Sequence, residues 1–343
     1  MNALESLWSR VLEARVRRYR TGRLAVERLG RPVLSIGNVT VGGTGKTPFI
    51  ERLARWMLEE GRRPAILSRG YGRSTKGTVV VSDGSGAGPL AGPLEGGDEP
   101  VLLARRLPRA VIAVAARRAE AGRAAEAFSP DVFLLDDGFQ HLALARDLDI
   151  VLLDAADPFG GERYPPFGGL REPLSALARA DAIVFTRIRA GAPSTETRER
   201  VLAANRGARR FTADIRPAGF CDEAGRPTGA PGEPVVAVSG IARPESFSEA
   251  LERLDVRPAE TLVFPDHRRY DQSDVERIAA AAGRAGARAI VTTEKDAVKL
   301  AGRLPVPIVS VRLEADVVEP EFFPFVRERL FGSRAAAHEE RAR

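Results

Sequence analysis

The sequence is poor in cysteine, lysine and long apolar runs. A single cysteine, Cys221, excludes an intramolecular disulfide and any metal site built from several cysteines. Residues 110–116 form a continuous apolar run of only seven, whereas a bilayer-spanning helix needs roughly 18. The N-terminus alternates charged with apolar residues, unlike the continuous apolar segment of a secretory signal. We therefore expect no transmembrane segment and no signal peptide, and a protein on the cytoplasmic side of a membrane.

Arginine supplies almost all of the positive charge, because only four of the 52 basic residues are lysines. The 343 residues are 44% hydrophobic and 29% charged, which excludes a disordered or collagen-like chain and suits a globular protein with a sizeable core. The length predicts two domains, or one large domain with an appendage. A net charge of +6 and a pI near 9.9 fit an anionic partner, either a nucleotide, a nucleic acid or an acidic lipid surface.

Residues 1–31 combine an apolar stripe with dense positive charge. The stripe recurs at helical spacing and contains Leu4, Leu7, Trp8, Val11, Leu12 and Val16. The same segment holds eight Arg and three Glu, a balance of +5 out of the net charge of +6. One interpretation is a helix packed on the protein with its basic face in solvent. The other is a helix lying in the plane of an anionic leaflet, where each basic residue contributes ~1 kcal/mol to binding. The two are compatible.

From Pro32 onward, short apolar strands alternate with amphipathic helices in two sets. We expect strands at 33–36, 65–68, 78–82, 110–114, 132–135, 148–153 and 183–186, then at 235–239, 261–264, 289–292 and 307–311. This alternation predicts an α/β fold, a parallel sheet with helices on both faces. We expect a larger domain over 32–215, a linker over 216–234, a smaller α/β domain over 235–332 and a polar tail over 333–343. The linker is expected because residues 216–233 contain three prolines and four glycines.

A glycine-rich loop follows the first expected strand and opens a helix. Its residues are Thr40, Val41, Gly42, Gly43, Thr44, Gly45, Lys46 and Thr47. A phosphate-binding loop needs inward-facing backbone N–H groups, a lysine for the β- and γ-phosphates and a hydroxyl for Mg²⁺. Thr40 stands where the usual pattern has its first glycine, and Gly42 and Gly43 can restore the flexibility. The pattern predicts a P-loop that binds a nucleoside triphosphate; the alternative is a turn that merely caps a helix.

Two adjacent carboxylates are expected at the end of a buried strand. Asp136 and Asp137 follow the apolar run at 132–135, and ligands of parallel sheets bind at the carboxyl ends of the strands. Together with the hydroxyl of Thr47 they are the expected Mg²⁺ ligands. The sequence does not decide which of the two carboxylates contacts the metal, and the alternative is an Asp-Asp-Gly turn that only ends the strand.

These motifs predict a kinase, an ATPase or a GTPase without naming a substrate. Guanine-specific switches carry Asn-Lys-x-Asp or Thr-Lys-x-Asp. The nearest segment, Thr293-Glu-Lys-Asp296, has its lysine one position too late. A nucleotide switch that delivers a metal is further disfavoured by one cysteine and three scattered histidines. A soluble P-loop kinase of a small metabolite, with its first helix simply packed, remains open.

Seven segments in order resemble the tetraacyldisaccharide 4'-kinases, the lipid A 4'-kinases of Gram-negative bacteria. They are Ser35–Pro48, Leu67–Arg73, Gly97–Pro100, Asp136–His141, Leu170–Leu174, Phe264–His267 and Thr292–Asp296. The family's loop shares the departure at Thr40 and the proline after Thr47. The resemblance implies a P-loop domain with a smaller C-terminal α/β domain and an active site between them. It implies transfer of the γ-phosphoryl of ATP to the 4'-hydroxyl of a tetraacylated glucosamine disaccharide 1-phosphate.

The resemblance also implies roles for two residues that the pattern alone leaves ambiguous. Asp98 corresponds to the aspartate that acts on the acceptor hydroxyl, although residue type alone favours a helix N-cap at this position. His267 corresponds to its partner, holding and tuning the carboxylate. With Lys46 on the phosphates, these are the expected catalytic residues.

Four further residues are candidates for contacts with substrate or phosphate. Arg171 can clamp a phosphate of ATP or of the acceptor, and Glu172 adjoins it; a surface Arg-Glu pair is the alternative. Arg118, or its neighbour Arg117, is a weaker phosphate candidate. Tyr71, flanked by glycines, can line the acceptor pocket or be an ordinary loop aromatic.

The implied acceptor explains the basic N-terminal helix. Each buried CH₂ retains a lipid in the bilayer by ~0.8 kcal/mol, so the enzyme has to come to the membrane. We therefore expect a peripheral protein on the cytoplasmic face of the inner membrane. Its expected partners are ATP with Mg²⁺, the acylated disaccharide and the anionic surface, and not nucleic acid.

Overall fold

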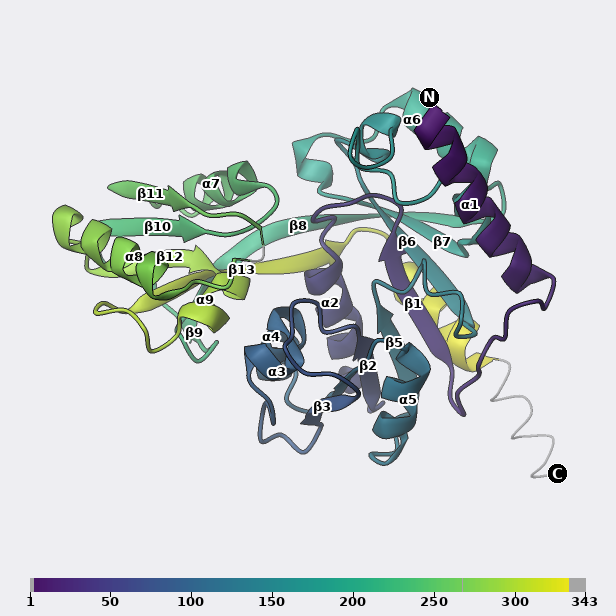
Figure 1. Cartoon of the computed structure of the whole chain (residues 1–343), viewed down its shortest axis with the longest axis horizontal. Coiled ribbons are helices and arrows are strands. Elements are labelled where there is room, and N and C mark those ends of the chain that lie inside the picture. The colour runs from purple at the N-terminus through teal and green to yellow at the C-terminus, as the bar shows by residue number, and fades with distance from the viewer. Residues whose placement is uncertain (1–2, 267, 333–343) are drawn as a thin grey trace.

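The computed structural model describes residues 3–266 and 268–332 and shows two lobes joined by two long strands (Figure 1). The larger half contains β1–β7 with α1–α6 and α10, and the smaller half contains β9–β12 with α7–α9. Strands β8 (Arg209–Cys221) and β13 (Ile308–Val317) run through both halves.

The elements of the larger half follow the expected alternation. Its strands are β1 Val33–Asn38, β2 Pro64–Ser68, β3 Val79–Asp83, β4 Val111–Val114, β5 Val132–Asp136, β6 Leu148–Asp154 and β7 Ala182–Thr186. Its helices are α1 Ala3–Arg20, α2 Lys46–Glu59, α3 Pro93–Gly96, α4 Asp98–Arg106, α5 Arg118–Glu126, α6 Thr195–Ala204 and α10 Phe322–Arg327. Short helical turns lie at η1 Gly160–Glu162, η2 Leu174–Arg179, η3 Ile188–Ala190 and η4 Glu328–Gly332.

The smaller half repeats the alternation on a smaller scale. Its strands are β9 Pro227–Thr228, β10 Val235–Ser239, β11 Glu260–Val263 and β12 Ala289–Thr293, and its helices are α7 Pro244–Arg253, α8 Gln272–Ala285 and α9 Glu294–Leu300. Within the described residues, thirteen strands form one sheet in the order β11-β10-β12-β13-β8-β7-β6-β1-β5-β2-β4-β3, with β9 paired to β8. The pairings are parallel except at β3, β9 and the β8–β13 junction.

Alternate residues of the central strands pack on opposite faces of the sheet. Leu34 and Ile36 of β1 enter the core that contains α2, α4 and α10, whereas Val33 enters the core on the α5 side. Both faces of these strands are buried, as expected for a parallel sheet covered by helices. The expected α/β fold class is therefore confirmed.

The segment expected to be a linker is partly a strand. Residues 216–221 are the second half of β8, which pairs antiparallel with β13 from Ala213↔Val317 to Cys221↔Ser310. The prolines and glycines of the segment suggested an irregular chain, but Pro217 lies next to a register shift in this ladder, where a missing N–H is tolerated. The two halves are thus joined by a strand pair instead of a loop.

The C-terminal residues expected in the smaller domain return to the larger half. Phe322 of α10 is fully buried, and its ring lies 5.7 Å from that of Phe49 and 5.1 Å from that of Phe211. Val326 and Leu330 enter the same core. The prediction that the smaller domain extends to residue 332 is therefore wrong for α10 and the residues after it, because β13 returns the chain to the larger half before α10 begins.

Helix α1 lies along the edge of the larger half (Figure 1). Several side chains of its apolar stripe are exposed. Leu7, Trp8 and Val11 keep 59%, 49% and 52% of their surface in solvent. The helix is tethered by Glu5, which is buried and accepts from Arg163 Nε at 3.1 Å. Among the described residues, no helix is long and apolar enough to cross a membrane.

Candidate active site

The glycine-rich loop joins β1 to α2 at the carboxyl edge of the sheet. Its residue Thr44 accepts from Asn38 Nδ2 at 3.3 Å, and the Thr44 carbonyl accepts from Thr186 Oγ1 at 2.9 Å. Gly42 and Gly45 have φ values of 112° and 81°, which disfavour other residues. The loop opens directly into α2, whose N-terminus directs unpaired N–H groups and partial positive charge toward it, as a phosphate site requires.

Thr40 needs no glycine conformation because it pairs with a second segment. It forms an antiparallel bridge with Leu170, flanked by hydrogen bonds from Val41 N to the Gly169 carbonyl (2.6 Å) and from Arg171 N to the Val39 carbonyl (2.8 Å). The Leu-Arg-Glu-Pro-Leu motif therefore lies beside the P-loop. This pairing also delivers the Arg171 side chain to the site.

Both halves line a single cavity of about 760 Å³ at the loop. The larger half contributes the P-loop, Asp98, Asp136 and Asp137, and the smaller half contributes Arg243 and Lys295. The two halves are joined at the cavity by Arg106 of α4, whose guanidinium lies 2.6 Å from Glu51 and 2.5 Å from Glu294 of α9. The site is therefore a cleft between the halves.

Asp137 is surrounded by cations. Lys46 Nζ lies 3.5 Å from its Oδ1, and Arg171 Nη1 donates to Oδ1 and Oδ2 at 2.8 and 2.7 Å. Burial raises the pKa of the Asp137 carboxyl, but Lys46 and then Arg171 outweigh it and hold the pKa below its ordinary value. Asp137 is therefore ionised at neutral pH.

Asp136 has the opposite environment. It ends β5 beside Ile36 of β1, is 4% exposed and accepts from Ser68 Oγ at 2.9 Å. Burial raises the pKa of its carboxyl to about 6, with Glu99 and Asp137 adding to the effect. Ionising this buried carboxylate is unfavourable without a nearby cation. A cation that binds together with the substrate would stabilise its ionised form.

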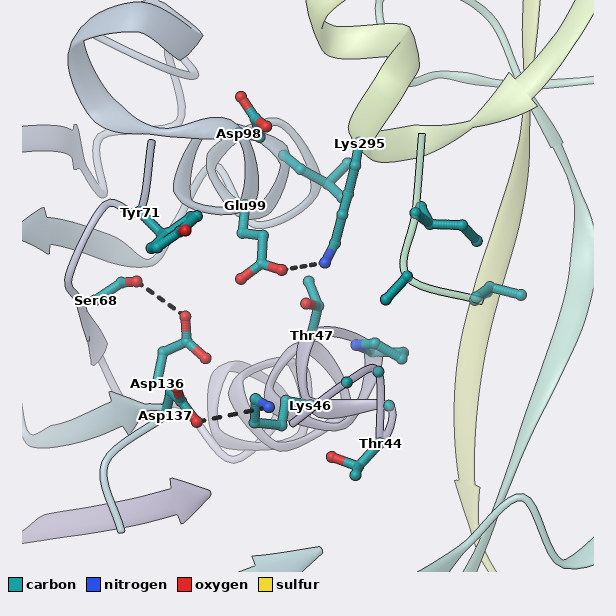
Figure 2. Close-up of a pocket in the computed structure, with 18 of the residues that line it drawn as sticks. Thr44, Lys46, Thr47, Ser68, Tyr71, Asp98, Glu99, Asp136, Asp137 and Lys295 are labelled. Carbon is teal, nitrogen blue, oxygen red and sulfur yellow. Dashed lines mark hydrogen bonds and ion pairs between the residues drawn. The ribbon is translucent and has the colours of Figure 1, made fainter. Parts of the chain in front are cut away.

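The first turn of α4 contributes two adjacent carboxylates that point in different directions (Figure 2). Glu99 is directed toward Thr47 and Asp136 and forms an ion pair with Lys295 of α9. The Asp98 carboxylate is directed away from them and lies 3.6 Å from Lys299 Nζ. Both lysines come from the smaller half, so this turn is held from across the cleft.

The remaining candidates are placed as follows. Glu172 is buried in an ion pair with Arg179 at 2.6 Å, and Tyr71 lines the cavity with 67% of its surface exposed. Arg118 is 5% exposed but lines the cavity, and its Nη2 donates to the Asp136 carbonyl at 3.4 Å. His267 lies outside the described residues, so its pairing with Asp98 stays a prediction.

Three site residues were not anticipated from the sequence. Ser68 lies in the segment Leu67–Arg73, and Glu99 lies in the segment Gly97–Pro100 next to Asp98. Both segments carry the family resemblance. Lys295 occurs in the segment considered as a guanine element. The scarcity of lysine could have drawn attention to it, since the chain has only four lysines.

Comparisons with known proteins agree with the geometry. Residues 1–330 match the family model LpxK, tetraacyldisaccharide-1-P 4'-kinase. A tetraacyldisaccharide 4'-kinase of Anaeromyxobacter dehalogenans is 44% identical over 317 residues, covering 88% of this chain and 83% of that protein. One from Pelobacter propionicus is 42% identical over 323 residues, covering 92% and 87%. The crystal structure described as the apo form of LpxK from Aquifex aeolicus in complex with ATP has a TM-score of 0.77 and 31% identity, covering 96% of this chain and 97% of that one.

Proposed function

The chain belongs to the tetraacyldisaccharide-1-P 4'-kinase family, and we propose how its own residues carry out that ATP-dependent phosphorylation of a lipid A precursor. The γ-phosphoryl of ATP passes to the 4'-hydroxyl of a tetraacylated glucosamine disaccharide 1-phosphate. The observation that carries the proposal is the convergence of the P-loop, the Asp136–Asp137 pair and the first turn of α4 on one cleft. Neither a soluble metabolite kinase nor a nucleotide switch accounts for the exposed apolar stripe of α1.

The P-loop residues hold the triphosphate. Backbone N–H groups between Gly42 and Thr47 donate hydrogen bonds to the phosphate oxygens. Lys46, the first residue of α2, neutralises charge on the β- and γ-phosphates. Phosphoryl transfer requires positioning and charge stabilisation more than covalent chemistry. Lys46 can supply both because Asp137 holds its ammonium at the cavity wall.

The residues at the loop fit Mg²⁺. The donors available are hard oxygens, from the Thr47 hydroxyl and the Asp136 and Asp137 carboxylates, and Mg²⁺ prefers such ligands. Among the described residues, no group of three or more His, Cys, Asp or Glu side chains is placed to hold a metal by itself. Mg²⁺ typically binds through one or two carboxylates together with substrate phosphates and water, so this set is sufficient. When bound, the ion neutralises developing charge on the phosphate oxygens.

Asp98 accepts the proton of the acceptor hydroxyl. It lines the cleft at the start of α4, on the side that faces the smaller half, and follows Gly97, whose φ of 94° allows the chain to turn there. A carboxylate within hydrogen-bond distance of the 4'-hydroxyl orients it toward the γ-phosphorus and takes its proton as the new bond forms. His267 is its proposed partner.

Helix α1 brings the cleft to the lipid. Its exposed Leu7, Trp8 and Val11 are suited to the interfacial region of an anionic leaflet, with arginines on the same helix contacting the headgroups. Arg15 of α1 also lines the cleft, and its Nη2 donates to the Gln140 carbonyl at 3.4 Å. The membrane-binding surface and the cleft are therefore continuous. We propose a peripheral position on the cytoplasmic face of the inner membrane.

The decisive experiment is a phosphorylation assay with ATP, Mg²⁺ and the disaccharide acceptor in detergent, followed by mass determination of the product. One added phosphate at the 4' position is expected. Asp98→Ala should abolish transfer while ATP binding is retained, and Lys46→Ala should lose both affinity and rate. Normal turnover of Asp98→Ala would remove this residue from the role of base. Phosphorylation of a water-soluble sugar alone, with no transfer to the acylated acceptor, would contradict the proposed substrate.

A further inference from the structure

We propose that Lys295 and Lys299 of α9 are positioning residues with two distinct tasks. Lys299 holds the Asp98 carboxylate in a fixed position at the cleft, and Lys295 neutralises Glu99 beside the triphosphate. The inference rests on the proposed function and extends it. It assigns to the smaller half the task of positioning the two carboxylates at the first turn of α4.

The placement of lysine in this chain is selective. Arginine accounts for 48 of the 52 basic residues, yet Lys46 and Lys295 line the cleft and a third lysine, Lys299, contacts the cleft residue Asp98. The fourth, Lys76, is exposed on a loop. A lysine ammonium is a compact point charge, whereas a guanidinium is wide, planar and forked. In a chain that otherwise uses arginine, lysine at these positions indicates that a compact cation is needed.

The Lys299 ammonium is held by residues of the smaller half as well as by Asp98. Its side chain is 9% exposed, and its Nζ lies 2.9 Å from Asp296 Oδ1 and 5.3 Å from the centre of the Tyr270 ring. Asp296 is itself fully buried, and its Oδ2 accepts from Gly240 N at 2.8 Å and from Thr293 Oγ1 at 2.7 Å. An ammonium held by this arrangement presents a defined position to Asp98 Oδ2, 3.6 Å away. It can therefore set the direction of that carboxylate.

Two of the groups that surround the Lys299 ammonium are closely packed against Gly240. A Cβ added at Gly240 would lie 2.8 Å from the Tyr270 hydroxyl and 3.1 Å from Asp296 Oδ1. The strand end, the ring and the carboxylate are thus packed against one another at the place that holds the Lys299 ammonium. Close packing of this kind favours a compact ammonium over a wide guanidinium.

Lys295, one helical turn earlier on α9, acts on the neighbouring carboxylate. It lines the cleft and forms an ion pair with Glu99, which is directed toward Thr47 and Asp136. Without Lys295, a full negative charge would remain beside the expected position of the triphosphate. Its removal should therefore weaken ATP binding, whereas removal of Lys299 should slow the chemical step.

The test compares Lys295→Met and Lys299→Met, with Lys76→Met as the exposed control. Both lysines lie on one helix and bridge the same two helices, so a merely structural role predicts the same change for both. We expect Lys299→Met to lower kcat about tenfold or more with KM for ATP within twofold of wild type. We expect Lys295→Met to raise KM for ATP at least about fivefold with a smaller change in kcat. Equal changes of kcat and KM in the two variants would overturn the assignment.

A second measurement does not depend on transfer. Double-mutant cycles in urea unfolding pair Lys299→Met with Asp98→Asn and Lys295→Met with Glu99→Gln, with Lys76→Met and Asp98→Asn as the uncoupled control. Each cleft pair should show a coupling of at least about threefold in the unfolding equilibrium constant, and the control pair none. Absence of coupling would overturn the pairing. If the wild-type protein does not phosphorylate the acceptor, the proposed function fails, while these cycles still decide whether the lysines hold the carboxylates.

Discussion

Arg171 is bound to Asp137, with its Nη1 within 2.8 Å of both carboxylate oxygens. The bridge between Thr40 and Leu170 carries the arginine to this position. Asp137 also lies 3.5 Å from Lys46 of the glycine-rich loop, so Arg171 is placed on the loop side of the cleft.

Replacement of Arg171 should therefore affect ATP and not the acceptor. We expect Arg171→Ala to lower kcat/KM for ATP by roughly 10- to 100-fold, since a hydrogen bond between charged groups contributes about 1.5–3 kcal/mol. KM for the lipid acceptor should stay within about twofold of wild type. Steady-state kinetics with each substrate varied in turn measures both, and Arg206→Ala, an exposed arginine, is the control. A rise in acceptor KM alone would instead assign Arg171 to the acceptor's phosphate.

His141 should make the folded protein sensitive to acid. Burial, reinforced by Arg118 and Arg146, lowers the pKa of His141 to about 4 from its ordinary value of 6.5. Between these values the unfolded chain binds a proton that the folded chain does not, so the free energy of unfolding falls as pH falls from 6.5 toward 4. The loss should reach up to about 3 kcal/mol, at ~1.4 kcal/mol per pKa unit.

Urea unfolding at several pH values checks this expectation. Wild type and His141→Gln should have parallel curves above pH 7, and wild type should lose stability more steeply below 6.5. Curves with the same slope throughout would mean that His141 does not carry the effect.

Phe322 should be required for the stability of the larger half, although it follows the smaller half in the chain. The side chain is fully buried and packs edge-on against Phe49 and Phe211. Phe322→Ala should destabilise the protein by about 3–5 kcal/mol, the usual cost of deleting a buried ring. Thermal or urea unfolding measures the change, and Leu202→Ala, which is 40% exposed, serves as the control. A loss below about 1 kcal/mol would contradict the packing of α10 on this core.

Trp8 should contribute to membrane binding. Its side chain is 49% exposed on α1, and a charge there opposes insertion at an anionic interface. We expect Trp8→Glu to reduce co-sedimentation with phosphatidylglycerol-containing vesicles about tenfold, and added salt to weaken the binding of wild type. Leu202→Glu, an equivalent change on α6, should have no effect. Binding that is independent of salt, of Trp8 and of residues 1–25 would refute docking through α1.

The local patterns of the sequence were sufficient to predict most elements. The strands at 33–36 and 132–135 and the helix after Gly45 were all anticipated, because alternating apolar runs and a glycine-rich turn act over a few neighbouring residues. The sequence predicts part of the strand over 209–221 to be a linker, since its proline and its glycine are typical of loops. Pairing with β13 overrides that local preference.

The sequence by itself determined the phosphate-binding loop, the carboxylates that follow β5 and the family to which the chain is similar, because each depends on residue types at fixed spacing. Only the tertiary structure decided that Arg171 serves Asp137, that α10 completes the larger core and that α9 brings its lysines to Asp98 and Glu99. These contacts join residues up to about 270 positions apart. No local pattern specifies which distant side chain pairs with a given charge or packs into a given space. The contacts between the halves depend on the β8–β13 pair, which sets how the two halves face each other, and the Arg171–Asp137 contact depends on the bridge between Thr40 and Leu170.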